Sequence, residues 1–182
     1  CHLAARDFRD IGHKIIYVSN SWRTLQTIGW QHAEPIVRSL AYALLAHEGD
    51  NPAKRDAPAD QPGRWNDQKL TTIRAGWMMG KTDPAVSRQL LSVLRTQGWQ
   101  EVSSQVITLL NQGYAPSVIW DALFSYGAEI LMKRPGIITL HSLTSLNAFH
   151  YAWQHTSSDR TRRFLLLQAA SFLPLFRNGG GV

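Results

Sequence analysis

The stretch from Pro135 to Ser158, PGIITLHSLTSLNAFHYAWQHTSS, decides the fold expected for this chain, because it runs 24 residues without an Asp, Glu, Lys or Arg. On a helical wheel two of its three histidines share one side with hydroxyl groups and small residues, and large apolar residues lie roughly opposite. The first side holds His141, Thr144, Ser145, Ala148, Tyr151, Ala152 and His155, and the second holds Leu143, Leu146, Phe149 and Trp153. Neither side is charged, so we expect helix 137–155 to be buried nearly all round, with its polar groups facing hydrogen-bonding partners or a ligand.

The composition around this stretch predicts one compact domain spanning residues 1–182. The chain has 44% hydrophobic and only 18% charged residues, with seven tryptophans. A length of 182 residues is enough for a full core, and so apolar a composition favours contact with a further segment or subunit. We therefore expect an all-α bundle of about eight helices, arranged as hairpins around helix 137–155, and belonging to a larger protein or assembly.

Glycine and proline residues divide the rest of the chain into helices and connections. The pattern predicts a first helix over 4–28 that ends at Gly29, and a second helix with Ile36, Leu40, Ala43 and Leu44 on its core face. Residues 48–64 are rich in proline and charge and are expected to form one long irregular loop. The remaining helices are expected over 66–80, 83–97, 99–112, 117–134, 137–155 and 157–176, followed by a flexible end at 178–182. Pro174 is expected to bend or end the last helix.

The formal charge of +6 is spread unevenly and argues against several classes of partner. Residues 65–182 hold eleven Lys and Arg against six acids, and the densest group is Arg160, Arg162 and Arg163. A nucleic-acid binder normally gathers its cations along one stripe, so the sequence disfavours that class. The apolar run of 13 residues from Phe164 to Phe176 is too short to span a membrane. The arginines stand at the start of the last helix, where the dipole disfavours them, so we expect specific acidic or anionic partners.

The familiar catalytic and cofactor motifs are missing from the sequence. It contains no GxGxxG, GxxxxGK[ST], GxSxG or HExxH pattern, and its single cysteine, Cys1, excludes an internal disulfide framework. The chain opens on Cys1 rather than Met, so any targeting segment is expected to lie outside it, and localisation cannot be read from the sequence.

The candidate chemistry therefore depends on histidines from different helices. The first expected helix repeats the two-faced layout, with His13, Tyr17, Asn20, Thr24 and Thr27 in one polar stripe. We expect His13, His141 and Thr144 to be catalytic, and His13, His141 and His150 to be the residues available to a metal ion. Asn20, Asn147, Tyr17 and Tyr151 are expected to bind a small apolar substrate.

Two other interpretations of polar residues stay open. His13 and Asn20 can be satisfied core residues that brace two helices. Asp121, Ser125 and Glu129 share one side of helix 117–134 and can form a solvated face, with Glu129 paired to Lys133. If this side turns toward His141 instead, a carboxylate meets a histidine, which is the minimum for a metal site or an acid–base pair.

A family resemblance enters through IGHKIIYVSNSWRTL (residues 11–25) and HSLTSLNAFHYAW (residues 141–153). Together these motifs resemble the helical questin oxidase-like proteins, whose His-x-x-Thr helix lies in an all-α scaffold. The resemblance implies an oxidoreductase that acts on an aromatic, polyketide-like substrate with oxygen and reduced nicotinamide, with His141 and Thr144 as the matching positions. The cofactor is thus expected to be either a metal ion or reduced nicotinamide.

The alternative is a non-catalytic, all-helical interaction module whose buried histidines are structural. Abundant tryptophan and an apolar last helix suit a surface that binds other protein segments. The two hypotheses differ in what surrounds the histidines. An enzyme predicts a pocket shared by His13, His141 and Thr144, whereas a module predicts bonds to the backbone and an exposed apolar patch elsewhere.

Overall fold

In the computed structural model, the described residues 1–6, 8, 10–46, 54 and 57–177 form an all-α bundle with eight α-helices. The N-terminal half contains α1 (His13–Ile28), α2 (Ala33–Leu45) and α3 (Gln61–Lys69). The C-terminal half contains α4 (Pro84–Thr96), α5 (Trp99–Asn111), α6 (Pro116–Lys133), α7 (Ile137–His155) and α8 (Asp159–Arg177). Short 3-10 turns lie at Ala4–Arg6, Trp30–His32, Pro58–Asp60 and Leu70–Thr72. The expected fold class is confirmed.

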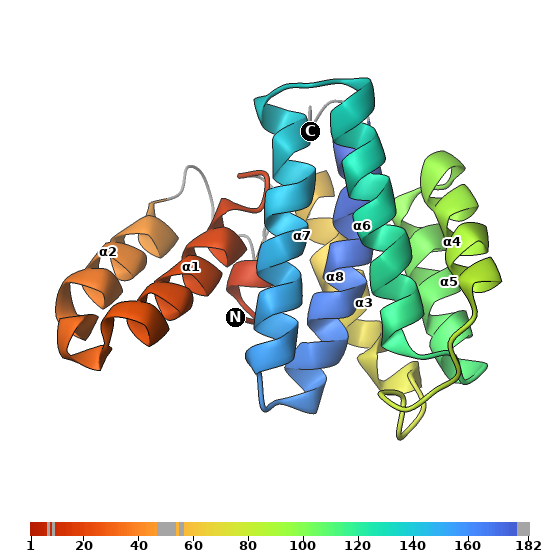
Figure 1. The fold of residues 1–182 in the computed structure, drawn as a ribbon, viewed down its shortest axis with the longest axis horizontal. Helices are drawn as coiled ribbons and strands as arrows, with labels where there is room; N and C mark the ends of the chain where they lie inside the picture. The colour runs from red at the N-terminus through yellow and green to blue at the C-terminus, as the bar shows by residue number, and fades with distance from the viewer. Residues whose placement is uncertain (7, 9, 47–53, 55–56, 178–182) are drawn as a thin grey trace.

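The core is built around α8, which lies between α6 and α7 in Figure 1. Every residue from Phe164 to Pro174 is buried, and the helix packs against α3, α5, α6 and α7. Helix α7 has the expected bounds of 137–155, but it is buried on one side only, because Leu140 and Asn147 stand on an exposed face. The most deeply buried helix is therefore α8, and the exposed face of α7 is available to form a site.

Helices α1 and α2 form a hairpin that projects from α7 on the side away from α4 and α5 (Figure 1). Helix α1 packs along α7, whereas α2 packs on α1. No residue of α2 is buried, so the core face expected from Ile36 to Leu44 is wrong: these side chains are only partly covered, by α1. The sequence also predicts that the first, sixth, seventh and eighth helices form the core, but α1 buries only Ile15, Ser19 and Leu25.

Two expected boundaries are wrong because close contacts between segments decide them. The expected loop 48–64 includes the start of α3, which begins at Gln61. Pro62 is tolerated in the first turn, because the backbone N–H that it lacks would have no partner within the helix. A Cβ on the buried Gly63 would lie 3.1 Å from the Arg6 carbonyl oxygen, so the helix start is pressed against the N-terminal segment. The part of this loop at 48–53 and 55–56, like the expected flexible end at 178–182, lies outside the described residues.

The expected helix 66–80 ends early, because other side chains bind its backbone. Asn111 Oδ1 accepts from the Arg74 amide at 2.8 Å, and Arg163 donates to the carbonyls of Leu70 and Ile73. These bonds replace the helical partners of the segment. Pro174, by contrast, neither ends nor interrupts α8, which continues to Arg177.

Candidate functional site

The site begins at Gly12, which separates the first expected helix into a 3-10 turn and α1. Gly12 has φ +86°, in the left-handed region that favours glycine. A Cβ at this position would lie 2.8 Å from Ser145 Cβ of α7, so the glycine also permits the start of α1 to lie close to α7. Further along, Ser19 Oγ donates to the Ala148 carbonyl at 2.8 Å. These contacts fix the start of α1 beside α7, and they place His13 next to His141.

His13 and His141 form a direct pair. Their Nε2 atoms are 2.8 Å apart and the ring planes are nearly perpendicular, at 85°. Behind the pair, His141 Nδ1 lies 2.6 Å from the Ile137 carbonyl oxygen, and His13 Nδ1 lies 3.0 Å from Asp10 Oδ1. His141 is only 9% exposed. All four ring nitrogens therefore have a partner, and the chain of contacts runs from a backbone carbonyl to a carboxylate.

These contacts determine how many protons the pair holds. A carbonyl oxygen and a carboxylate only accept, so both Nδ1 atoms must carry hydrogen. The contact between the two Nε2 atoms needs one further hydrogen. When all of these contacts are hydrogen bonds, the pair holds three hydrogens where two neutral imidazoles hold two, and Asp10, whose side chain is 54% exposed, lies beside the resulting positive charge. The geometry places the two imidazoles within hydrogen-bond distance of each other, with an oxygen acceptor behind each ring.

The pair forms one end of a groove of about 480 Å³ between α1 and α7. It is lined by His13, Ile16, Asn20, Arg23, Leu140, His141, Leu143, Thr144 and Asn147. The two histidines, Thr144, Asn20 and Asn147, which the sequence predicts for the site, therefore lie together. Thr144 Oγ1 is buried and has no hydrogen-bond partner within the described residues. An unpaired buried hydroxyl costs free energy. Thr144 lines the groove, but its Oγ1 is enclosed, so a ligand oxygen would reach it only by displacing the side chains that cover it.

The two predicted tyrosines, Tyr17 and Tyr151, are not among the residues that line this groove. Tyr17 stacks against His13, with ring centroids 5.7 Å apart, and is exposed. Tyr151 lines a neighbouring pocket of about 250 Å³, where its ring lies between His155 at 3.9 Å and the Arg23 guanidinium at 4.2 Å. Tyr151 therefore reaches the main groove only through Arg23.

The structure does not bring His150 to the histidine pair. His150 lies among Trp120, Phe124 and Trp153, and burial lowers the pKa of its imidazole, which favours the neutral ring. Two zinc-bound imidazole nitrogens in a tetrahedral site lie about 3.3 Å apart, wider than this pair. Within the described ranges, no group of three His, Cys, Asp or Glu residues could hold a metal ion. The expected metal triad of His13, His141 and His150 is therefore not assembled.

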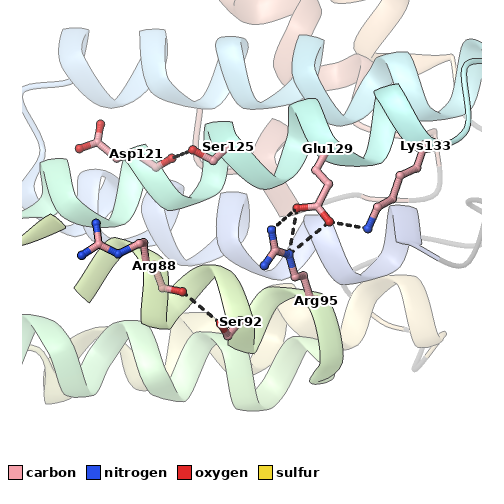
Figure 2. Close-up of polar contacts among 7 residues, drawn as sticks. All are labelled: Arg88, Ser92, Arg95, Asp121, Ser125, Glu129 and Lys133. Carbon is pink, nitrogen blue, oxygen red and sulfur yellow. Dashed lines mark hydrogen bonds and ion pairs between the residues drawn. The ribbon is translucent and has the colours of Figure 1, made fainter. Parts of the chain in front are cut away.

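Glu129 belongs to an ion-pair group with Arg95 and Lys133, as Figure 2 shows. Arg95 Nε and Nη2 donate to Glu129 Oε2 at 2.9 and 2.8 Å, and Lys133 Nζ donates to Oε1 at 2.5 Å. The hydrogen bonds from Arg95, and then from Lys133, lower the pKa of Glu129. Of the two interpretations left open for this side of the helix, the pairing with Lys133 is the one found. The carboxylate that meets a histidine is Asp10.

Two residues of the site were missed in the sequence. Asp10 stands three positions before His13, so a D-x-x-H pattern at a helix start was an available signal. Arg23 follows Asn20 by one turn and lines the same groove. The arginines that open α8, in contrast, have the expected partners. Arg160 binds Asp67 at 2.8 Å, Arg163 binds Asp159 at 2.7 Å, and Arg162 donates to backbone carbonyls.

The fold and the site together define an all-helical protein with a paired-histidine groove on the face of α7. No protein-family model, curated protein or solved structure matches the chain. No helix in the described part of the chain has the length and apolar character needed to cross a membrane.

Proposed function

We propose that this chain is an enzyme domain that moves protons to and from a small, largely apolar molecule bound in the α1–α7 groove. The observation that carries the proposal is the His13–His141 pair, whose Nε2 atoms lie 2.8 Å apart in the wall of a groove that Thr144 also lines. General acid–base catalysis requires a titratable group within hydrogen-bond reach of the substrate, and imidazole suits it best near neutral pH.

The roles follow from the contacts. Thr144 would hold a substrate oxygen one helical turn from His141, and the pair would give its shared proton to that oxygen or take one from it. The Ile137 carbonyl fixes the orientation of the His141 ring, because its contact with Nδ1 turns Nε2 toward His13. Asp10 stabilises the charged form of the pair, and its exposure to solvent gives the proton a route to water. Ile16, Leu140 and Leu143 cover the apolar part of the substrate.

An oxidoreductase acting on an aromatic substrate, as the resemblance to questin oxidase-like proteins implies, is the specific reaction class that we propose for this site. In that class the pair would act on a ring hydroxyl or carbonyl oxygen. Reduced nicotinamide is usually bound by a strand, a glycine-rich turn and a helix, and the described residues contain no strand. The described residues therefore do not fit a nicotinamide site of this kind, and we derive no step through that cofactor.

The test is turnover of hydroxylated naphthalenes and anthraquinones in the presence of oxygen and reduced nicotinamide, with products identified by mass spectrometry. We expect His141→Gln and His13→Gln to lose turnover, while His32→Gln, an exposed histidine on the 3-10 turn after α1, serves as the matched control. Imidazole ¹⁵N spectra recorded with the same compounds report binding independently of turnover. Turnover that survives both groove variants, or an absence of both turnover and imidazole shifts, would rule out the proposal.

A second candidate function, binding of another protein segment, is favoured by the α1–α2 hairpin. Its outer surface exposes six large apolar side chains: Trp22, Ile28, Trp30, Val37, Tyr42 and Leu45. Tyr42 and Leu45 are 79% and 82% exposed. Contiguous apolar surface on a soluble protein commonly marks an interface. Analytical ultracentrifugation of the wild type and of Tyr42→Asp tests self-association, and a monomeric wild type would restrict the surface to partners other than a second copy.

A further inference from the structure

Arg23 differs from Arg162, Arg163 and Arg177, which are also partly buried, in the kind of partner it has. Those three donate to backbone carbonyls or to Asp159. Arg23 donates through Nη2 to Asn147 Oδ1 at 2.5 Å, and its guanidinium lies 4.2 Å from the centre of the Tyr151 ring. No carboxylate is paired with it in the described ranges. A guanidinium has five N–H donors, so Arg23 is held in place with most of its donors still available.

The charge of the groove also favours an anionic ligand. None of the nine residues that line it is an aspartate or a glutamate, and Arg23 is its one permanently charged group. Asp10 lies behind His13 and balances the extra proton of the pair, so the charge of Arg23 is not compensated from that side. A concave surface with one uncompensated cation raises the local concentration of anions. The groove is therefore built to attract a negative charge to the end where Arg23 and Asn147 meet.

The spacing along α7 gives the length of a ligand that would reach both ends of the groove. His141, Thr144 and Asn147 follow one another at intervals of three residues. Six residues of α-helix span about 9 Å, at a rise of about 1.5 Å per residue. Between these ends the walls are aliphatic, from Ile16, Leu140 and Leu143. The polar groups therefore lie at two ends, with apolar surface between them.

We infer that the substrate of this groove is an amphipathic carboxylate, with its carboxylate on Arg23 and a hydroxyl or carbonyl oxygen at Thr144 and the histidine pair. An apolar body of about two fused rings spans the distance between the two oxygen groups. This inference rests on the proposed function, since it names the substrate class of the same site. Arginine recognises carboxylates through paired N–H donors, and the bond of Asn147 to Nη2 leaves the other donors to the ligand.

The experiment uses three related probes, 6-hydroxy-2-naphthoate, its neutral amide 6-hydroxy-2-naphthamide, and 2-naphthoate, which lacks the hydroxyl. Binding to the whole chain is measured by calorimetry and by imidazole ¹⁵N shifts of His13 and His141. We expect the amide to bind roughly tenfold or more weakly than the hydroxynaphthoate, because it loses a charge-assisted contact. The compound without the hydroxyl should bind but leave the imidazole shifts nearly unchanged.

Substitutions test whether Arg23 is the source of the preference for the acid over the amide. Arg23→Gln should bind acid and amide equally weakly, Arg23→Lys should keep part of the preference, and Arg88→Gln, an exposed arginine on α4, should behave as the wild type. Helical circular dichroism and the melting midpoint confirm that each variant is folded. If the amide binds as tightly as the acid and shifts the imidazoles, the carboxylate inference fails while the proposed site stands. If no probe shifts the imidazoles, both fail.

Discussion

Two groups of polar side chains lie within this apolar bundle, and they differ in what surrounds them. The first, which we call the core network, joins Asn66 of α3, Ser103 of α5, and Gln168 and Ser171 of α8, all fully buried. Asn66 Nδ2 donates to Gln168 Oε1 at 2.6 Å and to Ser171 Oγ at 2.9 Å, and Gln168 Nε2 donates to the Ala5 carbonyl. The second group is the histidine pair with Asp10 and Thr144, at the wall of a groove.

Each group has one oxygen without a hydrogen-bond partner. One of these oxygens lies in the enclosed core and the other in the wall of a groove. Asn66 Oδ1 and Thr144 Oγ1 both lack a hydrogen-bond partner. Asn66 is enclosed by α8, so its amide serves to fix the packing of three helices. Thr144 stands in the wall of the groove, beside the histidine pair. An unpaired polar atom therefore indicates a site only where it borders accessible space and reactive neighbours.

The core network should give the largest effect on stability when it is broken. Gln168→Leu leaves the buried Ala5 carbonyl without its side-chain partner and leaves the Asn66 amide with only its bond to Ser171, so we expect the free energy of unfolding to fall by about 3 kcal/mol. Urea denaturation measures this loss. Gln97→Leu, whose amide contacts only Thr96 at the exposed end of α4, should change it by less than about 0.5 kcal/mol. Equal losses in the two variants would contradict a structural role for the network.

A smaller loss of stability is expected when Gly12 is replaced, and this substitution should also disturb the histidine pair. Gly12→Ala puts a methyl group at positive φ and 2.8 Å from Ser145 Cβ, which should cost about 2 kcal/mol and move His13 away from His141. Gly76→Ala is the matched control, since it also has positive φ, at +65°, but its nearest atom is an Arg74 side-chain nitrogen at 3.9 Å. Imidazole ¹⁵N spectra should change in the first variant and stay the same in the second.

A substitution at Thr144 should raise stability, in contrast to the substitution at Gly12. Thr144→Val removes an unpaired buried hydroxyl and keeps its shape, so stability should rise by about 1 kcal/mol while binding of 6-hydroxy-2-naphthoate weakens. Thr139→Val, in the first turn of the same helix, loses bonds to the Arg134 and Gly136 carbonyls and should lower stability by about 1 kcal/mol. Thermal melting followed by calorimetric titration separates the two outcomes. A destabilised Thr144→Val with unchanged binding would assign Thr144 to the scaffold.

The smallest effect concerns Glu129, whose folded-state pKa is lowered by Arg95 and Lys133. A depressed carboxyl pKa contributes stability that is fully present above the unfolded value and is lost as pH falls through the folded value. Wild type should therefore lose up to about 1 kcal/mol as the solution is acidified below the usual glutamate range, and Glu129→Gln should lose less over the same range. Urea titrations at a series of acidic pH values compare the two. Parallel curves would show that the ion pairs contribute nothing to stability.

The sequence by itself determined the all-α class, the bounds of α7 and five of the nine residues that line the groove. Helix period and Gly or Pro boundaries are local properties, which is why 137–155 was predicted to the residue. His13, His141, Thr144, Asn20 and Asn147 were selected because uncharged polar groups on an otherwise apolar helix need partners. The same reasoning admitted His150 and Tyr151, since a helical stripe does not tell which neighbour it will meet.

Only the tertiary structure decided which polar groups meet, because that depends on contacts between residues far apart in the chain. The approach of Gly12 to Ser145 sets the pair, and no helical pattern of either segment contains it. Asp10, rather than Glu129, became the carboxylate partner for the same reason. The burial of α8 between α6 and α7 also left one face of α7 open, since a helix can be uncharged all round and still be covered on one side only. The local sequence indicates which residues need polar partners, and tertiary packing determines which partners they contact.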